Sequence, residues 1–254
     1  SIALEKAGVM RPFKTCIYAQ EKPPAALLKY AKNKSVNLLI HNNDYRVNLG
    51  SSNWSLKSKN NSINEIPNLK MIGDYQYNYA AASLLALDAI LPECLRDHDV
   101  IKKALSETEI SGRFQYLSKS PDIILDVAHN EDAARSLSDN IKKIGYDKII
   151  VVLGVLADKD VYSIVEPFSS LVDHWYIGTI NSERGMNSDE IKFRINSIYK
   201  NKLSIGTYAS VTSAFNTAKY DQTKDSLLLV YGSFYTVSEA LKAHLLEQKR
   251  DNAI

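Results

Sequence analysis

The second half of the chain alternates between short apolar runs and longer amphipathic segments. From Gly112 onward, runs rich in Ile, Val and Leu, such as KIIVVL and LLLVY, are typical of strands that are buried on both faces of a sheet. Strands are predicted there at Ile123–Val127, Ile149–Leu153, His174–Ile177, Leu203–Thr207 and Leu227–Tyr231. Helices are predicted between and after them, at about Asp132–Ile144, Val161–Leu171, Ser188–Tyr199, Val211–Tyr220 and Thr236–Gln248.

Strands that alternate with helices across short connections are typical of a mostly parallel sheet. We therefore expect an α/β fold in which residues 109–254 form a Rossmann-like domain, with helices on both faces of its sheet. Ligands of such sheets bind beyond the carboxyl ends of the strands, so the residues that follow each strand are the first candidates for a site.

The pattern before this domain is less regular. Short strands are predicted at Lys14–Ala19, Val36–His41 and Tyr45–Leu49. The Ser-, Asn- and Lys-rich stretch Gly50–Asn64 is typical of an exposed loop or hairpin. Ala- and Leu-rich Tyr79–Leu91 predicts a buried helix that ends at Pro92, and a short amphipathic helix follows around Val100–Leu105. Because only one helix is strongly apolar, we expect residues 1–108 to be the C-terminal part of a larger, incomplete α/β domain.

Composition narrows the class of protein. Apolar residues make up 45% of the 254, which is the globular norm, and 31 basic against 29 acidic residues leave a net charge of only +2. A chain so close to neutral has no overall field for nucleic acid or an anionic membrane, and we expect neither as a partner. Cys16 and Cys94 are too few for a disulfide scaffold and fit a reducing compartment, so we expect a cytoplasmic protein.

The richest group of polar side chains follows the first strand of the predicted domain. Asp126, His129 and Asn130 lie between the strand and the next helix, within Asp126-Val127-Ala128-His129-Asn130. Asp126 can accept a hydrogen bond from a ribose hydroxyl or hold a cation, and His129 can contact a phosphate or carboxylate. An Asx turn in which Asn130 caps the helix is an equally good interpretation of these residues.

Two further strand ends carry polar residues. Asp158-Lys159-Asp160 can place a lysine against an anion or can be a solvated cluster that caps the next helix. Gly232 and Ser233, in YGSFYT, can offer backbone N–H groups and a hydroxyl to an anion or can form an ordinary turn with a serine cap. Several motifs are absent from the sequence: G-x-x-x-x-G-K-[ST], G-x-G-x-x-G, G-x-S-x-G and the spacing of a zinc site.

The motif around Asp126 belongs to a longer run that resembles a known family. The stretch GRFQYLSKSPDIILDVAHNEDAARSL resembles the C-terminal domain of the bifunctional dihydrofolate synthase/folylpolyglutamate synthase, a Mur ligase-like protein. The resemblance continues through VLGVLADKD, DHWY, Arg184-Gly185 and YGSFYTV, and extends back to IALEKAGV and GDYQYNYAAA. It covers the whole chain, but only about the last 60% of a family member, so residues 1–108 resemble the end of the family's central ATPase domain.

The resemblance implies an ATP-dependent carbon–nitrogen ligase of folate biosynthesis and one-carbon metabolism. ATP phosphorylates the carboxylate of a dihydropteroate or folate to an acyl phosphate, and the amine of L-glutamate then displaces phosphate to form an amide. The implied cofactors are ATP and Mg²⁺, whose charge helps to neutralise the transferred phosphoryl group.

The resemblance also implies roles for single residues. Lys6 matches a lysine that is carbamylated and can then ligate Mg²⁺, and Asn78 matches an asparagine that contacts adenine. Arg113 matches an ATP-contacting arginine, and Asp126 matches a ribose-contacting carboxylate. The two remaining roles concern catalysis and L-glutamate, with His129 reaching toward phosphate and glutamate and Ser233 contacting glutamate.

The resemblance places the family's glycine-rich phosphate loop, its other Mg²⁺ ligands and most of its pterin pocket before Ser1. We therefore expect this chain to be a fragment of a longer synthetase and to be inactive alone. Two other functions stay open. One is a Mur-type ligase of peptidoglycan precursors, which shares the fold and the chemistry, and the other is a non-catalytic Rossmann-like module that binds glutamate or a partner domain.

Overall fold

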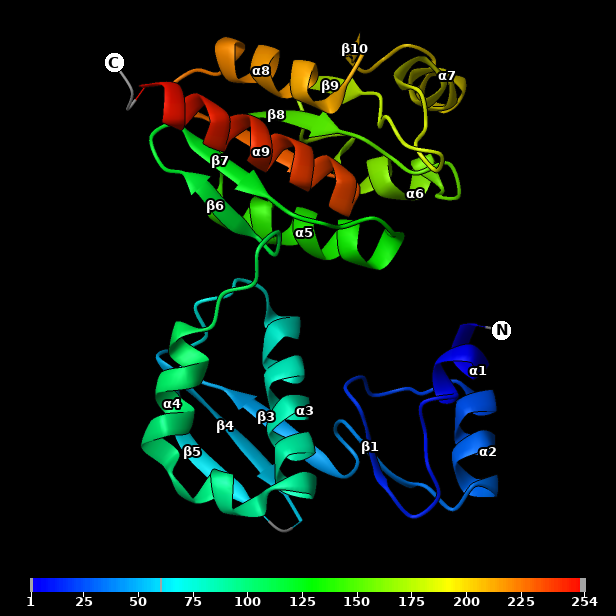
Figure 1. Cartoon of the computed structure of the whole chain (residues 1–254), viewed down its shortest axis with the longest axis vertical. Helices are drawn as coiled ribbons and strands as arrows, with labels where there is room; N and C mark the ends of the chain where they lie inside the picture. The colour runs from blue at the N-terminus through cyan, green and yellow to red at the C-terminus, as the bar shows by residue number, and fades with distance from the viewer. Residues whose placement is uncertain (1, 60, 252–254) are drawn as a thin grey trace. The chain divides into compact units, whose positions relative to one another are not determined.

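The structure, a computed structural model, describes residues 2–59 and 61–251. The chain divides into two compact units, Ser1–Glu109 and Ile110–Ile254, and each contains apolar cores of its own (Figure 1). None of the helices in the described ranges combines the length and the apolar character that crossing a bilayer demands.

The second unit is built on a six-stranded sheet with the order β10-β9-β8-β11-β7-β6. Its strands are β6 Gln115–Ser118, β7 Asp122–Leu125, β8 Lys148–Leu153, β9 His174–Gly178, β10 Ile205–Tyr208 and β11 Ser226–Tyr231. Every neighbouring pair is parallel except β6 and β7, which are antiparallel. The expected α/β class with a mostly parallel sheet is therefore confirmed.

Helices cover both faces of this sheet. They are α5 Glu131–Ile144, α6 Val161–Val165, α7 Ser188–Tyr199, α8 Val211–Asp221 and α9 Phe234–Asp251. On one face, Leu228 and Val230 of β11 belong to the core that contains residues of α8 and α9, which lie side by side (Figure 1). On the other face, Tyr231 donates its phenolic hydrogen to the carbonyl oxygen of Ile164 in α6 at 3.0 Å.

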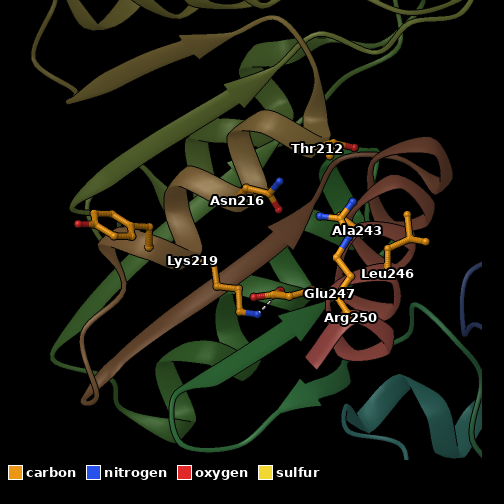
Figure 2. A pocket seen from close by; sticks show the side chains of 8 residues that line it. Thr212, Asn216, Lys219, Ala243, Leu246, Glu247 and Arg250 are labelled. Atoms are coloured by element: carbon orange, nitrogen blue, oxygen red, sulfur yellow. Dashed lines mark hydrogen bonds and ion pairs between the residues drawn. The ribbon is translucent and has the colours of Figure 1, made fainter. Parts of the chain in front are cut away.

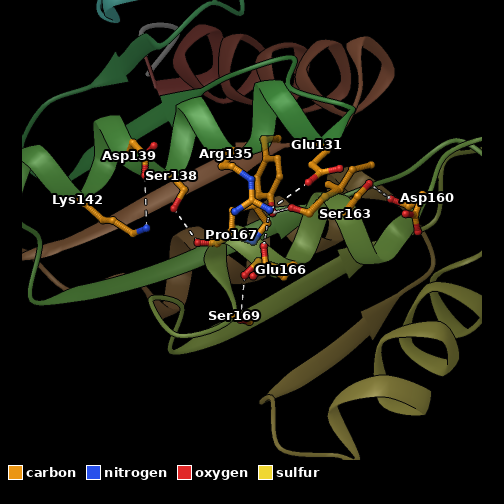
Figure 3. Close-up of polar contacts among 12 residues, drawn as sticks. Glu131, Arg135, Ser138, Asp139, Lys142, Asp160, Ser163, Glu166, Pro167 and Ser169 are labelled. Carbon is orange, nitrogen blue, oxygen red and sulfur yellow. Dashed lines mark hydrogen bonds and ion pairs between the residues drawn. The ribbon is translucent and has the colours of Figure 1, made fainter.

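The helix predicted at Val161–Leu171 is shorter in the structure. It ends at Val165 and continues as the 3₁₀ turn Glu166–Phe168. Pro167 lies in this turn, where its missing N–H takes no helical hydrogen bond away, and its carbonyl oxygen accepts the hydroxyl of Ser138 on α5 at 2.7 Å. Figure 3 shows this contact beside Arg135, which pairs with Glu131 of its own helix and with Glu166.

Strand β6 was not predicted. All four of its residues are half-buried, so the run QYLS lacks the alternation of buried and exposed positions that identifies a strand from sequence. It lies at the edge of the sheet and pairs with β7.

The first unit contains an antiparallel sheet of β3 Tyr45–Leu49, β4 Asn53–Ser58 and β5 Ser62–Pro67. The hairpin interpretation of Gly50–Asn64 holds, but the expected exposure is wrong at Trp54, Leu56 and Ile63, which are buried. These side chains form a core with apolar residues of α3 Asp74–Ile90 and α4 His98–Glu107. A 3₁₀ turn at Pro92–Arg96 connects the two helices.

The remainder of the first unit is a two-stranded parallel sheet of β1 Thr15–Tyr18 and β2 Asn37–Ile40. A small core is formed by Ala7 of α1 Ile2–Ala7, by Met10 just after that helix, and by Leu27 and Ala31 of α2 Ala25–Asn33. Helix α3 contacts β1 within the same unit.

Candidate functional site

The candidate site lies at the carboxyl ends of β7, β8 and β11 in the second unit. The chain leaves β7 for β8, and β11 later enters the sheet between these two strands. The order of the strands therefore reverses here, which is where open α/β sheets bind ligands. The backbone N–H of Asp126, just after β7, donates to the carbonyl oxygen of Val230 in β11 at 2.9 Å. The hydroxyl of Thr236, after β11, donates to the carbonyl oxygen of Gly154, after β8, at 2.8 Å. The loops after all three strands thus lie together.

Asp126 is the most buried acidic group of the site, with 4% of its surface exposed. Its carboxylate oxygens accept the backbone N–H groups of Phe114 and Ala128, each at 2.8 Å. Burial raises the pKa of this carboxyl group, whereas the two N–H donors and the nearby charges of Arg113 and His129 act in the opposite direction. Asp126 therefore joins the end of β7 to the segment before β6.

Arg113 lies in that segment, and two neighbours hold the backbone around it in the left-handed region, with φ of +72° at Gly112 and +45° at Phe114. Gly112 is also tied on both sides, because its N–H donates to the side chain of Gln115 at 2.9 Å and its carbonyl oxygen accepts the N–H of Val127 at 2.8 Å. An added Cβ at Gly112 would lie 2.9 Å from a methyl group of Val127. The half-buried Arg113 thus sits on a well-held turn near Asp126.

His129 has a defined orientation. Its Nδ1 lies 2.8 Å from the carbonyl oxygen of Val127, and because a carbonyl can only accept, Nδ1 carries the hydrogen. Nε2 is then the ring atom that can accept or donate a hydrogen bond to a ligand. The ring of Phe234, 60% exposed at the start of α9, lies with its centroid 6.3 Å away. The capping interpretation holds for Asn130, whose side chain accepts the N–H of Ala133 at 2.9 Å.

Ser233 lies at the start of α9 and is 2% exposed. Its hydroxyl oxygen accepts the backbone N–H of Thr236 at 3.0 Å and lies 2.8 Å from the hydroxyl of the same threonine. The serine-cap interpretation of this turn therefore describes its local geometry. Gly232 before it has a φ of +119°, which favours glycine.

In the Asp158-Lys159-Asp160 cluster, one aspartate caps a helix and the other forms ion pairs. Asp160 caps α6 by accepting the N–H of Tyr162 at 3.1 Å. Asp158 pairs with Lys159 at 3.0 Å and with Arg184 at 2.9 Å, and these partners lower the pKa of its carboxyl group to about 2. Arg184 comes from the loop after β9 and was not a predicted site residue, although its position after a strand was a usable signal.

The structure brings Arg113, Asp126, His129 and Ser233 to one end of the sheet. The other two predicted residues belong to the unit Ser1–Glu109. Lys6 is exposed on α1, with its Nζ 3.4 Å from the carboxylate of Glu5, and Asn78 is half-buried on α3. Across residues 2–59 and 61–251, no three His, Cys, Asp or Glu side chains gather as a metal site requires.

A separate groove of about 460 Å³ lies between α8 and α9. Figure 2 shows Lys219 of α8 facing Glu247 of α9 in an ion pair, with Asn216 and Arg250 among the other lining residues. None of the six predicted site residues lines this groove.

Comparison with known proteins gives a consistent result. Residues 112–234 match the family described as Mur ligase, glutamate ligase domain. The dihydrofolate synthase/folylpolyglutamate synthases of two Buchnera aphidicola subspecies are similar. That of subspecies Baizongia pistaciae is 32% identical and that of subspecies Acyrthosiphon pisum 29%, and each alignment covers 95% of this chain. These alignments cover 55% and 56% of the two relatives, so the chain spans about half the length of the curated relatives it matches.

Solved structures agree with the sequence comparison. Escherichia coli FolC in complex with DHPP and ADP superposes with a TM-score of 0.84 and 27% identity, over all of this chain and 57% of that one. The bifunctional enzyme of Yersinia pestis with AMPPNP and Mn gives 0.81 and 26%, over 98% of this chain and 56% of that one. Mycobacterium tuberculosis folylpolyglutamate synthase, at 19% identity and a TM-score of 0.82, shares the fold.

Proposed function

We propose that this chain belongs to the dihydrofolate synthase/folylpolyglutamate synthase family, to whose members it is similar over 95% of its length, and that it supplies the glutamate-ligase domain of an ATP-dependent ligase that adds L-glutamate to dihydropteroate or folates. The observation that carries the proposal is the meeting of Arg113, Asp126 and His129 at the switch point of the sheet. A cation, an anion and an oriented imidazole at one strand end match the needs of a reaction that moves a phosphoryl group and an amine.

In this proposal, Arg113 binds the phosphates of the nucleotide. Its guanidinium forms two parallel hydrogen bonds with phosphate oxygens, which a lysine in its place could not do. Each carboxylate oxygen of Asp126 keeps a second lone pair after accepting one backbone N–H, so Asp126 can also accept a ribose hydroxyl. For Asn78, the match to the family supports a separate role in contacting adenine.

Glutamate is bound from the side of His129. With Nδ1 donating to Val127, Nε2 reaches the phosphate of the acyl phosphate and the incoming glutamate. Ser233 contacts glutamate through the remaining hydrogen-bonding capacity of its hydroxyl, most of which serves the start of α9.

The proposed reaction has two steps, formation of an acyl phosphate and then of an amide. A substrate carboxylate oxygen attacks the γ-phosphorus of ATP, so that an acyl phosphate and ADP form. The glutamate nitrogen then attacks the acyl carbon, a C–N bond forms, the bond to phosphate breaks, and the amine loses a proton. The part of Arg113 is to offset the charge that develops on the transferred phosphoryl group.

Lys6 is the proposed link to the metal. Its exposed Nζ is accessible to carbon dioxide, and carbamylation converts the ammonium group to a carboxylate of the kind that Mg²⁺ prefers. Bound Mg²⁺ supplies positive charge to the phosphoryl oxygens. Intact mass spectrometry of the chain in bicarbonate buffer, with Lys6→Arg as control, tests for the added mass of one carbon dioxide.

We also propose that the chain is part of a longer, cytoplasmic synthetase whose phosphate-binding loop lies outside it, so that the chain alone does not turn over substrate. The coding sequence upstream of Ser1 tests this directly. Calorimetry on the chain tests it independently: weak ATP binding is expected, and submicromolar affinity contradicts the proposal.

The decisive experiment is an assay of glutamate-dependent phosphate release by the longer protein with dihydropteroate and, separately, with a UDP-muramyl substrate. Release with dihydropteroate alone supports the proposal, and release with the UDP-muramyl substrate alone identifies a Mur-type ligase instead. No release with either, together with glutamate binding by calorimetry, supports a non-catalytic module.

The role of Arg113 has a matched control. Arg113→Ala should raise the ATP concentration for half-maximal rate about tenfold or more, since it removes charge-assisted hydrogen bonds. Arg135→Ala removes an arginine whose partners are Glu131 and Glu166 on the helical face, and it should leave that concentration unchanged. Equal effects of the two variants would remove Arg113 from the nucleotide site.

A further inference from the structure

We infer that Thr236 is a positioning residue that locks together the loops after β8 and β11. Its side chain is fully buried, and its hydroxyl donates to the carbonyl oxygen of Gly154 at 2.8 Å. Its backbone N–H donates to the hydroxyl oxygen of Ser233 at 3.0 Å, and the two hydroxyl oxygens lie 2.8 Å apart. The Thr236 hydroxyl thus contacts both a carbonyl of the loop after β8 and the hydroxyl of Ser233, the serine that caps α9 after β11.

The two loops approach so closely that only small groups fit between them. A Cβ added to Gly154 would lie 2.7 Å from the hydroxyl oxygen of Thr236, and one added to Gly232 would collide with the carbonyl oxygen of Gly154. In this confined space the Gly154 carbonyl has the Thr236 hydroxyl as its donor, and losing that donor costs the desolvation of a buried acceptor.

Each loop carries part of the site. Beyond Gly154, the backbone N–H of Ala157 donates to the carbonyl oxygen of Arg184 at 2.8 Å, and Asp158 pairs with the guanidinium of the same arginine. Beyond Ser233, Phe234 brings its ring to His129. The Thr236 hydroxyl therefore couples the side of the site that holds Arg184 to the side that holds His129.

The chemistry of the side chain suggests two informative variants. Thr236→Val keeps the β-branched shape and removes the hydroxyl, so the Gly154 carbonyl loses its donor. Thr236→Ser keeps the hydroxyl. Thr217→Val is the matched control, because the Thr217 hydroxyl donates at 3.0 Å to a carbonyl of its own helix, that of Ser213.

Hydrogen exchange of the chain, measured by mass spectrometry, tests the coupling. Thr236→Val should speed exchange about tenfold both in peptides from the loop after β8, residues 154–160, and in peptides from the turn after β11 with the start of α9, residues 232–237. Thr236→Ser should stay within about twofold of the unaltered chain, and Thr217→Val should leave both loops unchanged. Faster exchange in only one loop, or in neither, would overturn the inference. If Thr236→Val does not fold, Thr236→Cys replaces it, because a thiol is a much weaker donor.

The consequence for catalysis rests on the proposed function. In the longer protein, Thr236→Val should raise KM for glutamate and lower kcat, each by about fivefold or more, and Thr236→Ser should restore both. Unchanged kcat and KM in Thr236→Val would overturn the positioning role. If the unaltered protein shows no glutamate-dependent turnover, the proposed function fails, while the exchange experiment still decides whether Thr236 couples the loops.

Discussion

The carboxylate of Asp126 accepts the backbone N–H of Phe114, twelve residues earlier in the chain, at 2.8 Å. Phe114 has a positive φ, so this bond holds a strained turn, and Arg113 precedes it directly. Asp126, which matches a ribose-contacting carboxylate, therefore also stabilises the turn that carries Arg113.

This relationship predicts a loss of stability in Asp126→Asn. The amide keeps one acceptor oxygen and turns an NH₂ group toward the other backbone N–H, so one buried donor loses its partner. We expect the free energy of unfolding to fall by about 1–3 kcal/mol, measured by urea denaturation of the chain. Asp139→Asn is the control, since Asp139 is exposed and its ion pair with Lys142, at 3.5 Å, lies on the surface of the helix. Equal losses of unfolding free energy in both variants would contradict the stabilising role of the Asp126 carboxylate.

A pair of glycines separates backbone strain from collision. Gly145 and Gly232 both have positive φ, at +81° and +119°, but a Cβ added to Gly145 meets open space. Gly145→Ala should therefore cost about 1 kcal/mol of unfolding free energy from conformation alone. Gly232→Ala should cost clearly more, because its Cβ collides with the Gly154 carbonyl. Thermal unfolding by circular dichroism measures both, and similar costs would show that the loops can separate easily.

The hydrogen bond of His129 predicts its tautomer. In the neutral ring, nitrogen NMR should show a protonated Nδ1 and a bare Nε2, because Nδ1 donates to the Val127 carbonyl. The exposed His98 serves as the reference ring in the same spectrum. A bare Nδ1 in His129 would mean that the ring has turned and that a different nitrogen faces the ligand.

The lowered pKa values of three histidines predict that the stability of the fold depends on pH. Burial lowers the pKa of His41, His174 and His244 below the usual 6.5. The unfolded chain therefore binds more protons than the folded chain just below this pH, so the unfolding free energy falls as pH drops through about 6.5. Urea unfolding between about pH 7.5 and 5.5 measures the slope, which should be shallower in His244→Gln. A stability that rises on acidification would contradict this prediction.

The sequence by itself determined the succession of elements in the second unit. Apolar runs such as KIIVVL and LLLVY need burial on both faces, and the amphipathic segments between them supply it, so the α/β class and the mostly parallel sheet follow from local pattern. The polar residues after β7, β8 and β11 were equally visible, because they immediately follow those runs. Buried Trp54 and the half-buried strand β6 were missed, since neither lies in a pattern that reports burial.

Only the tertiary structure decided what those polar residues contact. Asp126 meets Phe114 because β6 folds back antiparallel to β7, and Thr236 meets Gly154, 82 residues away in the chain, because β11 pairs with β8. The order of strands in a sheet depends on the packing of all helices and strands together, and no local propensity encodes it. A short motif can therefore indicate that Asp126, His129 and Ser233 belong to a site, whereas hydrogen bonds over long sequence separations determine which of their atoms remain free to act.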